Sequence, residues 1–228
     1  MISIRNLSIK FDGNEVLKNI NIDFESNKIH GVVGLNGAGK TTFFNILAKT
    51  IKPDSGVIKN NNFGLTIRDT AYLETVNFFY SGITANEYLK IFKQTNPEFK
   101  LAILQEYFKL PLDELIENYS TGMKKKLALL SVMKQDKPVF ILDEPFNGLD
   151  LETNEVLQLI ITRLRQKDKT VFISSHILEQ LLSTCDEIHL LEDGQFVKSF
   201  SKNDFDKIDD ELFGKLRIEA QKIISTAL

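Results

Sequence analysis

A glycine-rich segment near the N-terminus has the residue types and the spacing of a phosphate-binding loop. Residues 34–41 read G-L-N-G-A-G-K-T and fit the pattern G-x-x-x-x-G-K-[ST]. The glycines let backbone N–H groups approach a polyphosphate closely, and a helix that begins at the loop turns the positive end of its dipole toward the anion. In that arrangement Lys40 reaches the β and γ phosphates, and the Thr41 hydroxyl binds Mg²⁺. The residues predicted to bind the nucleotide here are Gly34, Asn36, Gly37, Ala38, Gly39, Lys40, Thr41 and Thr42.

Two consecutive carboxylates, Asp143 and Glu144, follow an apolar run at residues 139–142. Such a run is typical of a strand buried on both faces, and open α/β sheets bind ligands at the carboxyl ends of their strands. Phosphoryl transfer needs a group that holds the metal and a group that orients the attacking water. We therefore expect Asp143 to bind Mg²⁺ and Glu144 to polarise the water. Taken alone, the pattern fits a solvated turn equally well, and it is the upstream loop that favours the catalytic interpretation.

The segments around these residues predict how they are positioned. Alternating apolar residues at 2–4 and 20–24 predict antiparallel strands, and short strands are also expected at 57–58, 65–67 and 71–73. Helical periodicity runs from 84 to 135, and buried strands are expected again at 171–173 and 188–191. The predicted fold is α/β, with a P-loop NTPase core around a mixed central sheet, an N-terminal antiparallel β-subdomain and an inserted all-helical subdomain. The predicted divisions are 1–73 (antiparallel subdomain and first part of the core), 74–137 (helical subdomain), 138–200 (second part of the core) and 201–228 (C-terminal helical tail).

Further motifs, in order along most of the chain, resemble those of the ABC ATPase family. Residues 119–127, Y-S-T-G-M-K-K-K-L, are similar to the family signature, usually written LSGGQ. Residues 147–150, N-G-L-D, resemble the D-loop, and residues 174–176, S-S-H, resemble the switch-histidine motif. Phe11 stands where the family has an aromatic residue that stacks on adenine. The segment 78–89 is similar to the region after the Q-loop in prokaryotic exporter subunits.

This resemblance implies an ATP-hydrolysing subunit of an ABC transporter, with ATP and Mg²⁺ as cofactors. It implies a homodimer or heterodimer of ATPase subunits that drives a separate transmembrane permease, with export as the expected direction. The protein would then be cytoplasmic and peripheral on the cell membrane. In the implied dimer, each ATP lies between the phosphate loop of one subunit and the signature of the other. The residues implied are Lys40, Glu144 and His176 in catalysis, and Phe11, Ser120, Gly122 and Asp150 in nucleotide binding.

The Q-loop and the signature depart from the family pattern. The family has a metal-binding glutamine near residues 72–73, where this chain has Glu74 and Thr75. We interpret Glu74 as a candidate cation ligand in its place. In the signature, Thr121 and Met123 replace a glycine and a glutamine.

Composition limits the other functions that the chain could have. The 228 residues include 28 Lys and Arg against 31 Asp and Glu, a net charge of −3, so no basic field draws the chain to nucleic acid and we expect no such partner. No run approaches the roughly 20 apolar residues that cross a bilayer, and the N-terminus does not resemble a signal peptide. Two alternatives stay open: a soluble ABC ATPase acting on nucleic acid or ribosomes, and a slow-turnover regulatory module that binds ATP.

Several other reactive residue types receive structural interpretations. His30 and His189 have no ligand partners at metal spacing. Cys185, the single cysteine, lies in an apolar periodic segment and is interpreted as a core residue. The run Lys124 to Lys126 is expected to form one solvated helix face, with one lysine near the nucleotide interface as the alternative.

Overall fold

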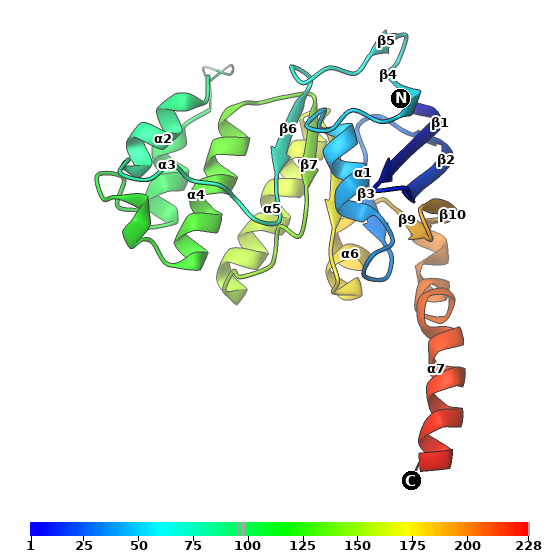
Figure 1. Cartoon of the computed structure of the whole chain (residues 1–228). Coiled ribbons are helices and arrows are strands. Elements are labelled where there is room, and N and C mark those ends of the chain that lie inside the picture. The colour runs from blue at the N-terminus through cyan, green and yellow to red at the C-terminus, as the bar shows by residue number, and fades with distance from the viewer. Residues whose placement is uncertain (95, 97–98, 228) are drawn as a thin grey trace.

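The N-terminal strands form an antiparallel sheet, as the alternation of apolar residues predicts. The computed structural model describes residues 1–94, 96 and 99–227. In it, β1 (Ile2–Phe11), β2 (Asn14–Phe24), β4 (Ser55–Asn60) and β5 (Phe63–Gly64) are ordered β2-β1-β4-β5. Ile2 pairs with Phe24 and Ile4 with Ile22, so that the apolar residues of both strands share one face. Figure 1 shows this sheet beside the N-terminus and next to α1 (Lys40–Leu47).

The second sheet has six strands and is mixed, which confirms the predicted fold class. Its order is β10-β9-β3-β8-β7-β6, and only the β9–β10 pair is antiparallel. The strands are β3 (Ile29–Val33), β6 (Thr70–Leu73), β7 (Val139–Leu142), β8 (Thr170–Ser174), β9 (Glu187–Glu192) and β10 (Gln195–Ser201). Because β3, β7 and β8 run parallel, their carboxyl ends lie at one edge of the sheet, where the phosphate loop and the acidic pair follow.

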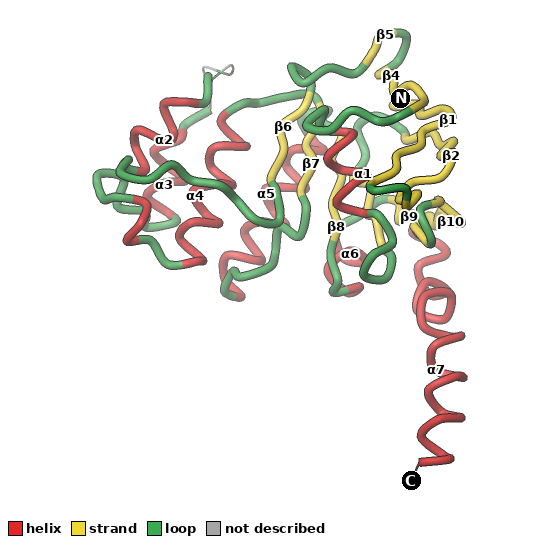
Figure 2. Tube along the Cα trace, viewed as in Figure 1, coloured by secondary structure: helices red, strands yellow, loops and turns green. Residues whose placement is uncertain are grey.

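Helices cover the sheet and extend beyond it. Two helices lie along the sheet, α5 (Leu151–Gln166) and α6 (Leu178–Thr184) (Figures 1 and 2). Three more lie beyond β6: α2 (Ala85–Ile91), α3 (Leu101–Tyr107) and α4 (Thr121–Lys134). A short 3₁₀ helix, η1 (Ile116–Asn118), precedes α4. After a second 3₁₀ helix, η2 (Lys202–Lys207), α7 (Ile208–Ala227) projects from the body of the molecule (Figure 1). Within the described residues, no helix combines the length and the apolar character needed to cross a membrane.

Two buried clusters lie on opposite faces of the six-stranded sheet. One contains Phe24, Phe43 and Phe172 and joins the antiparallel sheet and α1 to this sheet. Its rings meet edge to face, with the centroids of Phe24 and Phe172 4.9 Å apart. The other contains Leu127, Leu157, Leu181 and Ile173 and attaches α4, α5 and α6 to the opposite face. Because neighbouring residues of a strand point to opposite faces, Phe172 packs in the first cluster and Ile173 in the second.

The strand expected at residues 65–67 is wrong. These residues form a turn after β5, although Leu65 is buried. The Asp69 carboxylate accepts hydrogen bonds from the Thr66 backbone N–H at 2.8 Å and from its hydroxyl at 2.7 Å. This side-chain bonding to the local backbone stabilises a turn in competition with strand pairing.

Candidate functional site

The phosphate loop connects β3 to α1 and depends on two glycines. Gly39, at the N-cap of α1, has φ = 104°, a left-handed conformation that favours glycine. A Cβ on Gly34 would lie 2.2 Å from the Leu191 carbonyl oxygen, so this position has no room for a side chain. The Lys40 ammonium donates to the Gly34 carbonyl at 2.8 Å, and burial lowers the pKa of this lysine. The loop thus holds a cation beside the N-terminus of a helix, an arrangement suited to a polyphosphate.

Asp143 is connected to the loop and to the neighbouring strand. Its carboxylate accepts a 2.8 Å hydrogen bond from the Thr41 hydroxyl, and the residue is 1% exposed. The Ser174 hydroxyl, at the end of β8, donates to the other oxygen of Asp143 and accepts from the Glu144 backbone N–H at 2.9 Å. The hydroxyl of Thr41 and the carboxylate of Asp143 are hard oxygen donors, which are the ligands that Mg²⁺ prefers. The sequence motif gave no role to the Ser174 hydroxyl, because its contact depends on the β7–β8 pairing.

Glu144 is directed by a strained backbone and paired with His176. Its φ is 49°, a left-handed value that is uncommon for a residue other than glycine, asparagine or aspartate. One carboxylate oxygen lies 2.8 Å from Nδ1 of His176 and 3.3 Å from the His176 backbone N–H. The structure therefore brings together two residues that are 32 positions apart in the chain.

A cleft of about 450 Å³ opens between the phosphate loop and the acidic pair. Its lining residues are Val16, Asn36, Gly37, Gly39, Lys40, Thr41, Thr42, Thr75, Asp143 and Glu144. The cleft combines backbone N–H groups of a helix N-terminus, an ammonium group, two carboxylates and hydroxyl groups. Such a set can bind a polyphosphate with a divalent cation and can hold a water molecule against the terminal phosphate.

The remaining candidates of the phosphate loop and of the Q-loop lie beside the cleft. Gly34 accepts the Lys40 bond, and the Ala38 backbone N–H donates to Leu35 at 3.1 Å. Thr75 lines the cleft, and the lining residues do not include Glu74. Phe11, at the end of β1, is 43% exposed and is not a lining residue either.

Ser120, Gly122 and Asp150 lie at the N-termini of two helices. The Ser120 hydroxyl accepts from the Met123 backbone N–H at 3.2 Å and caps α4, where Gly122 lies in the first turn. Asp150 caps α5 by accepting from the Thr153 N–H at 2.7 Å. Hydrogen bonding from Thr153, first from its side chain and then from this N–H, lowers the Asp150 pKa to about 2. The lining residues of the cleft include none of these three.

The expectation that Lys124 to Lys126 form one solvated face is wrong. Consecutive residues of an α-helix point about 100° apart, so three in a row cannot share a face. Lys125 is only 6% exposed, and its ammonium group reaches the Glu74 carbonyl oxygen at 3.5 Å. Burial lowers its pKa to about 8, although Asp143 and Glu144 favour the charged form. A buried cation thus lies between the signature helix and the Q-loop.

Comparisons with known proteins give the family of the chain and its fold. The family model described as "ABC transporter" matches residues 17–147. The ABC transporter ATP-binding protein YtrB of Bacillus subtilis is 32% identical over 222 residues, which cover 92% of this chain and 74% of that protein. A solved structure described as the ATP-binding subunit of an ABC transporter has a TM-score of 0.83 and 24% identity, and covers 96% of this chain and 98% of its own. The ATP-binding cassette MJ0796, solved as a dimer in a post-hydrolysis state with ADP and phosphate, has a TM-score of 0.78 and 21% identity over 89% of this chain and 99% of its own.

Proposed function

Because this chain belongs to the ABC transporter family, we propose that it powers a membrane-embedded partner by closing on ATP as a dimer and reopening after hydrolysis. The chain is an ABC transporter ATP-binding subunit, and its activity is that of an ATPase. The proposal concerns four further points: the role of each residue, the dimer, the membrane partner and the direction of transport.

One observation carries the proposed chemistry: Thr41, Asp143, Glu144 and His176 meet around the phosphate loop through contacts of 2.8 Å. In our proposal, Lys40 and the loop N–H groups bind the phosphates, and Thr41 and Asp143 would hold Mg²⁺, which supplies charge neutralisation when bound. Glu144 polarises the attacking water. His176 holds the Glu144 carboxylate in position and contacts the γ-phosphate. The metal role expected for Glu74 is not part of the proposal, because Thr75 lines the cleft in its place.

The proposed dimer places a second copy's signature over the cleft. Ser120 is exposed and Gly122 is half-buried at the N-terminus of α4, so this helix end is accessible to a phosphate held by another subunit. The dimeric state of MJ0796 supports the formation of a dimer. The exposed ring of Phe11 would stack on the adenine, a contact typically worth about 1–3 kcal/mol. Asp150 would lie near the nucleotide at the dimer interface.

The proposed membrane partner would dock on the Q-loop side. Val76, Phe78 and Tyr80 are 82%, 71% and 56% exposed, and large apolar side chains grouped in this way mark interaction sites. Docking there would place the subunit on the cytoplasmic face of the membrane. Export is the proposed direction, supported by the resemblance of residues 78–89 to exporter subunits. A gene for a multi-span membrane protein beside this one would favour this proposal over an ABC ATPase that acts on ribosomes or nucleic acid.

The direct test is Glu144→Gln. We expect this variant to bind ATP with near wild-type affinity, to hydrolyse it at least about 100-fold more slowly, and to elute as a dimer in ATP, because the water is no longer polarised while the phosphate contacts remain. Phosphate release and size-exclusion chromatography with light scattering measure these effects. Glu155→Gln, which changes an exposed carboxylate of α5, is the matched control. Hydrolysis at the wild-type rate by Glu144→Gln would remove this residue from its proposed role.

A further inference from the structure

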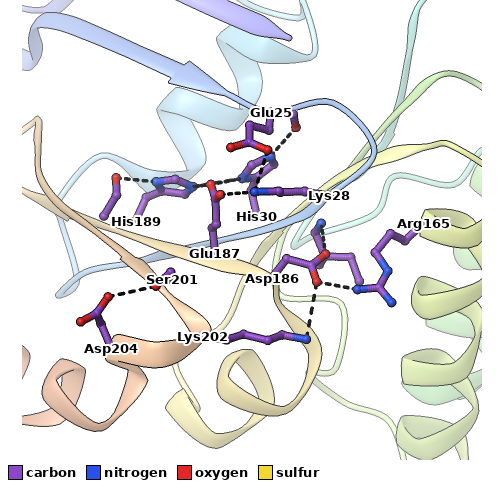
Figure 3. A network of polar contacts seen from close by, with 12 residues as sticks. Glu25, Lys28, His30, Arg165, Asp186, Glu187, His189, Ser201, Lys202 and Asp204 are labelled. Carbon is purple, nitrogen blue, oxygen red and sulfur yellow. Dashed lines mark hydrogen bonds and ion pairs between the residues drawn. The ribbon is translucent and has the colours of Figure 1, made fainter.

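The parallel pairing of β3 with β9 brings together two histidines that the sequence treats separately. His30 and Glu187 are register partners, and His189 lies two residues further along β9 on the same face. His30 is 0% exposed and His189 is 2% exposed, whereas the Glu187 side chain is 21% exposed. Nδ1 of His30, Nε2 of His189 and Oε2 of Glu187 point toward one another (Figure 3). This cluster is separate from the phosphate cleft, whose lining includes none of these residues.

We propose that His30, His189 and Glu187 form a binding site for a transition-metal ion, with Zn²⁺ as the preferred occupant. The two nitrogens are 3.1 Å apart, and they lie 3.5 and 3.8 Å from Oε2 of Glu187. The point equidistant from the corners of a triangle with these sides lies about 2.0 Å from each corner, the length of a zinc–nitrogen or zinc–oxygen bond. Two imidazoles with one carboxylate favour zinc over Mg²⁺ or Ca²⁺, which prefer oxygen ligands.

The second layer of contacts holds each donor in the orientation that a metal requires. Nε2 of His30 lies 2.7 Å from the Glu25 carbonyl oxygen, which only accepts, so this nitrogen carries the hydrogen. Nδ1 of His30 therefore has a lone pair, which can bind a metal or accept a hydrogen from Nε2 of His189 at 3.1 Å when no metal is bound. Nδ1 of His189 lies 2.7 Å from the Ser199 hydroxyl, which can accept its hydrogen and free Nε2 in the same way. Ligating histidines usually donate their other ring nitrogen to such acceptors.

Charge balance and access also suit a cation. The nearby Lys28 ammonium is paired with both Glu187, at 2.6 Å from its Oε1, and Glu25, at 2.7 Å. One lysine facing two carboxylates leaves a net negative charge beside the two neutral rings. Oε2 of Glu187 lies 3.5 Å from Nδ1 of His30 and 3.8 Å from Nε2 of His189, so an anionic oxygen is available beside both rings. Ser199 is exposed and Glu187 partly so, which gives an ion a short route from solvent.

An ion at this position would join β3 to β9 four residues before the phosphate loop begins. Phe24 and Phe172 pack against the His30 ring, with centroids 5.2 and 5.3 Å away, so that one side of the site is apolar. The three protein ligands leave one coordination position for water. The site is therefore expected to stabilise the fold beneath the loop and to be independent of the chemistry in the cleft.

The test uses the full chain without nucleotide, first stripped of metal and then titrated with Zn²⁺ against a competing chromogenic chelator. Excess Mg²⁺ is present throughout to occupy the oxygen ligands around Thr41 and Asp143. We expect one Zn²⁺ per chain and a rise in the thermal unfolding temperature on binding. Co²⁺ should bind in the same place with the visible absorption of a four-coordinate ion, and Zn²⁺ should displace it. Absence of Zn²⁺ binding, or a six-coordinate Co²⁺ spectrum, would overturn the proposal.

Variants assign the ligands. Glu187→Gln keeps the size of the side chain and removes the anionic donor, and we expect it to weaken Zn²⁺ binding by about 100-fold, since changes outside the ligand shell alone cost about 10–100-fold. Glu25→Gln is the matched control, because it removes the other carboxylate paired with Lys28 but keeps the carbonyl that holds His30. Because this carboxylate is paired with Lys28 and is not a proposed ligand, the affinity should fall by no more than about 10-fold, the lower end of that range. Equal affinity of Glu187→Gln and wild type would refute the assignment, and the Co²⁺ spectrum of the wild-type chain decides the question if this variant does not fold.

Discussion

Replacing Lys125 by methionine should make the nucleotide-free chain more stable, although it removes a charged residue from the signature helix. The side chain is 6% exposed, and among the described residues its ammonium donates to one carbonyl oxygen, that of Glu74, at the long distance of 3.5 Å. Methionine has a similar length and needs no hydrogen-bond partner. The substitution therefore removes a poorly compensated buried charge without leaving a cavity.

The pKa of Lys125 sets the magnitude. A fall from 10.5 to about 8 corresponds to about 3 kcal/mol of unfavourable free energy for the buried charged form. Because the folded pKa lies below the unfolded one, this cost is fully present below about pH 8 and disappears as the pH rises toward 10.5. We expect Lys125→Met to raise the free energy of unfolding at pH 7 by about 1–3 kcal/mol, and the advantage over wild type to shrink between pH 8 and 10.

Urea denaturation at a series of pH values measures this difference. Lys124→Met is the control, because it makes the same substitution at the neighbouring, partly exposed position. It should change the free energy of unfolding by less than about 0.5 kcal/mol. A loss of stability in Lys125→Met at pH 7, or an advantage that does not change with pH, would refute the reasoning from burial.

Two further changes test the phosphate loop and the helical region. Lys40→Ala should lower ATP affinity by about 100-fold, the equivalent of about 3 kcal/mol for a lost charge-assisted contact, as measured by titration with a fluorescent nucleotide. The exposed Lys52→Ala should bind normally, and unchanged affinity in Lys40→Ala would contradict the role of the loop. Thr84→Ala should destabilise the chain by about 1 kcal/mol in urea denaturation, because the Thr84 hydroxyl accepts from the Glu87 N–H at 3.2 Å to cap α2. Thr84→Ser keeps the hydroxyl and should retain stability, and equal stability of the alanine and serine variants would argue against the cap.

Local patterns in the sequence were sufficient to predict most of the fold. The alternation around Ile2 and Ile4 predicted antiparallel pairing, and the apolar run at 139–142 predicted a central strand, because burial on one or two faces leaves a direct trace in the order of residues. The strand expected at 65–67 failed for a different reason. Thr66 and Ile67 favour a strand by propensity, but the Asp69 carboxylate accepts from the Thr66 backbone N–H and stabilises a turn. Residue propensities do not include this contact between a side chain and the backbone.

The cluster of His30, His189 and Glu187 and the burial of Lys125, which the sequence did not reveal, depend on contacts between distant strands and helices. His30 and His189 are 159 residues apart, and the pairing of β3 with β9 brings Nδ1 of His30 to 3.1 Å from Nε2 of His189. Lys125 belongs to a run of three lysines that resembles a solvated surface, and its burial follows from the packing of α4 against β6. The phosphate loop, in contrast, is a continuous motif whose residues are neighbours in the chain, so its position could be predicted directly.

The left-handed backbone at Glu144 has a consequence for how this sequence can change. A residue with a Cβ in that region costs roughly 1–2 kcal/mol, and glycine would relieve much of the strain. Mutations that are screened only for thermal resistance should therefore accumulate glycine at position 144 and lose the carboxylate. In the proposed mechanism, this less stable turn is retained because it carries the carboxylate that polarises the attacking water.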